Sequence, residues 1–113
     1  MKIEFEKNMM IASELLSYCH LRGAEEYHLD VKQTDRETVF TIKASPARIP
    51  EEDMEPLRKK LGAPRQREIE QDFWELSGES ESYSELTLVG MMSDDVDIEY
   101  DGQTLSITIQ RLV

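Results

Sequence analysis

The chain has 113 residues, of which 39% are hydrophobic and 33% charged, and its net charge is -11. A chain of this length is long enough for one core but not for two, so we expect a single domain over residues 1–113. The strong negative charge disfavours nucleic acid as a partner, because it repels phosphate backbones.

The sequence also argues against a membrane and against an oxidising compartment. The longest apolar stretch, Leu86–Met92, is interrupted by Thr87 and Gly90 and is too short to span a bilayer. The first residues alternate charge and hydrophobicity, which is not the pattern of a signal peptide. Cys19 has no second cysteine to pair with, which favours a reducing, cytoplasmic environment.

The first half of the chain predicts a strand, a helix and a hairpin. The alternation over residues 1–7 is typical of a short strand. Asn8 is expected to cap a helix over residues 9–22, and Gly23 is expected to end it in the left-handed conformation. The buried stripe of this helix is predicted from helical spacing as Ala12, Leu15, Leu16 and Cys19. Residues 27–31 and 38–44 alternate on either side of a polar turn, which predicts an antiparallel hairpin.

Two helices are expected in the middle of the chain. The first covers residues 53–61, because Pro56 is tolerated only in a first turn that begins near Asp53. The second follows Pro64 and carries Phe73 and Trp74 in its apolar pattern. These two aromatic residues belong either to the core or to a helix that fills a vacated pocket.

The last third predicts a helix and a second hairpin. Ser82 and Glu85 have the spacing of a capping box for a helix that runs through Ser93. The sequence Asp101-Gly102 is typical of a two-residue type I′ turn between alternating strands. The fold class expected from this order is α+β, a two-layer sandwich with a mostly antiparallel mixed sheet covered on one face by helices.

This order of elements resembles the ATP-binding domain shared by histidine kinases, gyrase and anti-sigma-factor serine kinases, the GHKL superfamily. The resemblance runs from about Asn8 to Val113. In the family, the first helix carries a Glu, then two apolar residues, a variable residue and a metal-coordinating Asn. The segment "ELLSY" lies at this place, so Glu14 matches and Tyr18 stands where the Asn is expected.

A second family motif, Asp-x-Gly-x-Gly-Ile-Pro, follows the first hairpin, where this chain has "ASPARIP". Ala44 replaces the Asp that accepts a hydrogen bond from adenine. Pro46 and Arg48 replace the two glycines, which let backbone N–H groups approach phosphates. Ile49 and Pro50 are retained.

The third family motif opens the last helix with Gly-x-Gly-Leu. In "YSELTLV" the apolar part is kept, but Tyr83 and Glu85 replace the glycines. Without the Asp, the glycines and the Asn, no group would hold adenine, phosphate or magnesium. The resemblance therefore implies a pseudo-ATPase with no cofactor and no metal, whose vestigial site comprises Glu14, Tyr18, Ala44, Pro46, Arg48, Tyr83 and Glu85.

Other candidate residues have ordinary interpretations. His20 and His28 have no further ligand at metal-binding spacing. The acidic clusters at residues 51–53 and 93–97 do not follow a calcium-loop spacing, and capping and solvation account for them. The basic residues between Arg58 and Arg67 pair within the chain or meet an acidic partner.

The expected function is a non-catalytic regulatory or protein-interaction module that binds a protein partner or a second copy of itself. Its candidate surfaces are the edge strand over residues 1–7 and the helix after Pro64. The alternative is a divergent ATP-binding, anti-sigma-factor-like serine kinase in which Glu14 still acts as the general base. A third possibility is a loop rebuilt for another small molecule.

Overall fold

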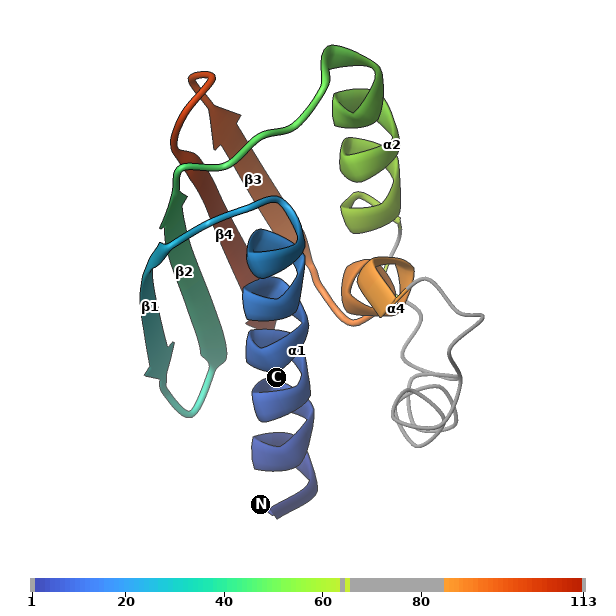
Figure 1. Cartoon of the computed structure of the whole chain (residues 1–113). Coiled ribbons are helices and arrows are strands. Elements are labelled where there is room, and N and C mark those ends of the chain that lie inside the picture. The colour runs from blue at the N-terminus through green and yellow to red at the C-terminus, as the bar shows by residue number, and fades with distance from the viewer. Residues whose placement is uncertain (1, 64, 66–84, 113) are drawn as a thin grey trace.

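The computed structural model describes residues 2–63, 65 and 85–112, which form a layer of helices on a β-sheet (Figure 1). Its helices and strands are α1 (Lys2–Leu21), β1 (Glu26–Gln33), β2 (Glu37–Ser45), α2 (Glu51–Leu61), α4 (Glu85–Met91), β3 (Asp95–Tyr100) and β4 (Leu105–Leu112). The described strands lie in the order β1-β2-β4-β3, and all neighbours are antiparallel. The predicted α+β two-layer sandwich is confirmed. The expected helix with Phe73 and Trp74 and the cap at Ser82 lie outside the described residues.

Alternation along the central strands builds the core. In β2, Phe40 and Ile42 are fully buried on the helix-covered face, while Thr41 points to the opposite face and stays partly exposed. β4 repeats this pattern with Ile107 and Ile109, which pair with those residues across the strands. From α1, Ile11, Leu15 and Cys19 have no exposed surface. The predicted burial of Ala12, Leu15 and Cys19 is confirmed, but Leu16 is only partly buried.

The prediction of a strand over residues 1–7 is wrong, because α1 begins at Lys2. The segment up to Leu21 contains no Gly or Pro, and Lys7 and Asn8 are buried on the side of α1 that also carries Ile11. Burial at this helical spacing outweighs the short alternation before it. Asn8 therefore lies inside the helix and is not its N-cap.

Helix α2 begins at Glu51, two residues before the predicted start. Pro56 consequently lies in the second turn, where its missing N–H leaves the carbonyl of Glu52 without its helical donor. The carboxylate of Asp53 caps nothing and instead pairs with Arg22, which directly follows α1.

The turn between β3 and β4 also differs from the prediction. β3 ends at Tyr100 and β4 begins at Leu105, so the loop has four residues instead of two. Gly102 has φ of +93°, but Asp101 does not have a positive φ, which a type I′ turn would require. The Asp101 carboxylate accepts hydrogen bonds from the backbone N–H groups of Gln103 and Thr104 at 2.9 and 2.7 Å, and this closes the wider loop.

Helix α4 packs directly against α2 through Gly90. A Cβ atom at this position would lie 2.1 Å from the carbonyl oxygen of Lys60 and 3.1 Å from backbone atoms of Leu61. Only a residue without a side chain allows this approach of the two backbones.

Candidate functional site

The C-terminal end of α1 carries a cluster of polar side chains at the place where the resemblance implies a nucleotide site. The guanidinium carbon of Arg22 lies 5.4 Å from the ring centroid of Tyr18, and Arg22 Nε donates to the Tyr18 hydroxyl at 3.2 Å. Arg22 Nη1 also pairs with Asp53 Oδ2 of α2 at 3.1 Å. Burial raises the pKa of Tyr18. Burial works against the charged form of Arg22, but its contacts with Tyr18 and Asp53 raise its pKa overall. The guanidinium group of Arg22 thus lies over the face of the Tyr18 ring.

A small hollow remains beside this cluster. Its volume is about 90 Å³, and Leu57 and Lys60 of α2 and Leu86 of α4 line it together with Tyr18 and Arg22. Pockets that hold a drug-sized ligand usually measure about 300–1,000 Å³. As the described residues shape it, this hollow has room for a few waters.

Three further positions of the predicted site, Ala44, Pro46 and Arg48, lie in the core or in the loop that follows β2. Ala44 is 1% exposed and is paired with Leu105 of β4. Pro46 follows a cis peptide bond and is half-buried. The side chain of Arg48 is exposed, and its backbone N–H donates to the carbonyl oxygen of Arg22 at 3.0 Å.

The structure brings only part of the predicted set together. Glu14 is half-buried one turn before Tyr18 on α1, so the two share a face of the helix. Glu85 begins α4, whose Leu86 reaches the small hollow. Tyr83 lies outside the described residues.

A larger hollow, which the sequence did not predict, lies on the sheet face that no described helix covers. It measures about 420 Å³ and is lined mainly by hydroxyl and charged side chains: Thr41, Lys43, Glu99, Thr104, Ser106 and Thr108. None of these residues is buried, so the hollow is a shallow, wet surface.

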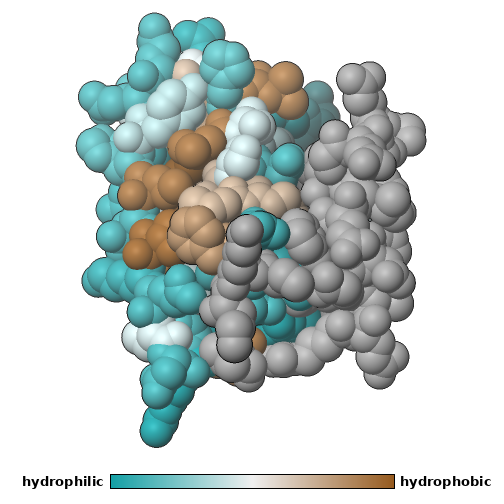
Figure 2. Space-filling model, turned by 90° about the horizontal axis from the view of Figure 1, so that it is seen from below, coloured by the Kyte–Doolittle hydropathy of each residue, from teal (hydrophilic) through white to brown (hydrophobic). Residues whose placement is uncertain are grey.

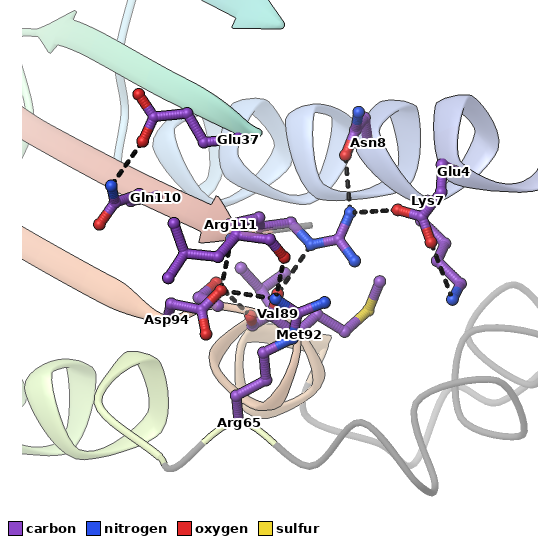
Figure 3. A network of polar contacts seen from close by, with 12 residues as sticks. Glu4, Lys7, Asn8, Glu37, Arg65, Val89, Met92, Asp94, Gln110 and Arg111 are labelled. Atoms are coloured by element: carbon purple, nitrogen blue, oxygen red, sulfur yellow. Dashed lines mark hydrogen bonds and ion pairs between the residues drawn. The ribbon is translucent and has the colours of Figure 1, made fainter. Parts of the chain in front are cut away.

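A buried arginine organises the opposite end of the molecule (Figure 3). Arg111 of β4 is 3% exposed and donates from Nη1 to Asn8 Oδ1 at 2.8 Å and to Glu4 Oε2 at 3.2 Å. Its Nε donates to the carbonyl oxygen of Met92 at 2.8 Å. These contacts join α1, β4 and the end of α4, and they have a structural role.

One of the basic residues considered above forms a second contact at this end. Arg65 Nη1 pairs with Asp94 Oδ2 at 2.5 Å and donates to the carbonyl oxygen of Leu112 at 2.7 Å. Pairing within the chain is therefore confirmed for Arg65, whereas Asp94, for which capping or solvation was expected, forms this ion pair instead.

The thiol of Cys19 and the imidazoles of His20 and His28 have different environments. Cys19 is fully buried, and burial raises its thiol pKa to about 11. His20 Nδ1 lies 3.2 Å from the hydroxyl oxygen of Tyr27, and His28 is exposed on β1. Within residues 2–63, 65 and 85–112, no three His, Cys, Asp or Glu side chains are grouped so that they could bind a metal ion.

An exposed apolar surface follows α1 and β1. The contact between His20 and Tyr27 joins the end of α1 to the start of β1, and residues at helical spacing from His20 share its face of α1. We call the set the α1–β1 surface: the exposed residues Phe5 and Met9 of α1 and Tyr27 and Leu29 of β1, together with the partly buried Leu16 and Val31. Phe5 is 53% and Met9 40% exposed. Figure 2, a view from the N-terminal end of α1, shows hydrophobic residues gathered next to hydrophilic ones. The sequence contained this signal as the alternation in β1, but it did not show that the strand lies at an edge.

Comparisons with protein-family models, curated proteins and solved structures give no match for this chain. Among the described helices, none combines the length and the apolar character that crossing a membrane requires.

Proposed function

We propose that this domain is a non-catalytic, pseudo-ATPase-like module that acts in the cytoplasm through protein–protein contacts. The observation that carries the proposal is the α1–β1 surface, where large apolar side chains lie exposed beside the outer strand β1. Large apolar side chains that gather on an exposed surface mark interaction sites. A buried, free Cys19 supports a reducing compartment.

The order of the described elements supports a relationship to the GHKL superfamily. From α1 onward the chain has a helix, a hairpin, two described helices and a second hairpin, which is compatible with the order that the resemblance implies. The contacts of Arg22 support the loss of the nucleotide site, since its guanidinium lies on Tyr18 and its charge is matched by Asp53.

Calorimetric titration with magnesium–ATP and magnesium–ADP tests the absence of nucleotide binding. We expect no saturable heat, with an active ATP-binding domain titrated in parallel as a positive control. Saturable micromolar binding would overturn the proposal and favour the divergent serine kinase. Thermal stabilisation by another metabolite would favour a rebuilt small-molecule site.

A second experiment tests the interaction surface. The variant Phe5→Glu, Met9→Glu is compared with Thr41→Glu, Thr108→Glu, which adds the same charge to the uncovered face of the sheet. Affinity capture by the wild-type domain should retain partners that the first variant loses and the second keeps. Equal capture by both variants would contradict a role for the α1–β1 surface.

A further inference from the structure

The outer edge of β1 has no neighbouring strand among the described residues. At the end of the hairpin, the N–H of Thr34 donates to the carbonyl oxygen of Glu37 at 2.8 Å. Backbone groups alternate in an antiparallel ladder, so the even-numbered residues of β1 direct their N–H and C=O groups toward β2. Tyr27, Leu29 and Val31 therefore direct theirs to the open edge.

The side chains of the same residues are incompletely covered. Tyr27 and Leu29 pair with Ala44 and Ile42 and lie on the helix-covered face with them. Nevertheless, Tyr27 is 36% and Leu29 37% exposed, while Ala44 and Ile42 are buried. In Figure 1, β1 is the outermost strand of the sheet on its side. A further strand beside β1 would bury this apolar row.

The polar face of β1 carries a self-complementary charge pattern. Glu26 and Lys32 are equally far from Leu29 in sequence, and so are His28 and Asp30. In an antiparallel pair of identical strands centred on Leu29, each residue faces its mirror position. Each acidic residue would then face a basic or imidazole side chain of the other copy.

We propose that two copies of this chain associate through β1, antiparallel and in the register that places Leu29 opposite Leu29 of the second copy. Glu26 then lies opposite Lys32 across the two-fold axis, and His28 lies opposite Asp30. On the other face, Tyr27 lies opposite Val31. The two sheets become one, and the closed symmetry leaves neither β1 edge open.

The charge pattern favours a second copy over an unrelated strand as the occupant. Each copy carries a net charge of -11, so general repulsion opposes self-association. Across the proposed β1 pair, however, Glu26 of one copy lies opposite Lys32 of the other, so the local interaction is attractive. The inference rests on the proposed function and deepens it by naming one partner of the module.

Charge exchange on β1 provides the test, with the dimer dissociation constant measured by sedimentation into the high micromolar range. Lys32→Glu places a glutamate opposite Glu26 at both ends of the pair, and we expect it to weaken the dimer about tenfold. Adding Glu26→Lys to that variant restores opposite charges and the original net charge, and should restore the wild-type constant. Both positions are exposed, so melting temperatures control for folding. A wild-type protein that stays monomeric would overturn the inference. A dimer whose dissociation constant does not change with Lys32→Glu would also overturn it.

Amide hydrogen exchange tests the register. The outward N–H groups of Tyr27, Leu29 and Val31 should become protected as the protein concentration rises, while protection of Asp30, which faces β2, should not change. Protection that does not depend on concentration would contradict pairing through this edge.

Different results would overturn the proposed dimer and the proposed function. A monomer that still captures partners through the α1–β1 surface removes the dimer and keeps the interaction module. A dimer that binds magnesium–ATP removes the pseudo-ATPase and keeps the pairing through β1.

Discussion

Arg111 and Asn8 are 103 positions apart in the sequence, and their side chains meet in the buried interior through a 2.8 Å hydrogen bond. The same guanidinium donates to the carbonyl oxygen of Met92, so its removal leaves two buried acceptors without this donor. The pair therefore joins the first helix to the last strand.

Arg111→Ala should reduce the free energy of unfolding by about 3 kcal/mol, because buried acceptors lose a charged donor. Urea unfolding followed by circular dichroism measures the change. Arg36→Ala, in the exposed turn between β1 and β2, is the matched control and should change stability by less than about 0.5 kcal/mol. Equal losses in the two variants would contradict the structural role of Arg111.

Glu4 should make stability depend on acid pH. Burial opposes its ionisation, but the charges of Arg111 and Lys7 lower its pKa overall from the ordinary value of 4.5. A lowered folded-state pKa stabilises the fold above the unfolded value, and this contribution is lost as pH falls through the folded-state value. Glu4→Gln should therefore cost about 0.5–1 kcal/mol at neutral pH.

The difference between Glu4→Gln and wild type should disappear as the pH is lowered well below 4.5. Urea titrations at a series of pH values measure it. Glu55→Gln, at an exposed position of α2, controls for the loss of one negative charge. A difference that persists unchanged in acid would contradict an electrostatic role for Glu4.

Gly90→Ala should be strongly destabilising, by about 2–3 kcal/mol, because its methyl group overlaps the backbone of α2. Gly102→Ala is the comparison: apart from its chain neighbours, no residue has an atom within 4 Å of the added carbon, and only its φ of +93° is unfavourable. That strain costs about 1 kcal/mol. Thermal and urea unfolding of the two variants separate close packing from backbone strain, and equal effects would contradict the packing of α4 on α2.

Cys19 should react with a disulfide reagent only after unfolding. With its pKa raised to about 11, about one thiol in a thousand is ionised at pH 8, and the side chain has no exposed surface. Absorbance during reaction with Ellman's reagent, with and without urea, measures the rate. Leu21→Cys in a Cys19→Ala background places a thiol at a residue that is 77% exposed and should react at once. Fast reaction of Cys19 in the folded protein would contradict its burial.

Local patterns predicted most of the elements, and long-range contacts account for the main errors. The hairpin of β1 and β2 follows from alternation on both sides of a turn, a signal contained in neighbouring residues. Residues 1–7 alternate as well, but Lys7 and Asn8 are buried as part of α1, where Glu4 and Asn8 meet Arg111. The sequence pattern contains no sign of a partner so far along the chain.

The candidate surfaces depended on sheet order, which the sequence does not encode locally. Alternation placed Leu29 on the apolar face of its strand, and the register with Ile42 agrees. Its partial exposure arises because β1 lies at the edge, which only the arrangement of the whole sheet decides. In the same way, the contact of Arg22 with Asp53 joins two helices that the sequence predicted separately.

The place of β4 between β2 and β3 has a consequence for how the protein is made. β4 follows every other described element, so a nascent chain presents the inner side of β2 to solvent until Leu105–Leu112 leaves the ribosome. During synthesis the first hairpin therefore has two open sides, and the addition of β4 closes the side at β2, which lowers the exposure of unpaired strand edges to aggregation.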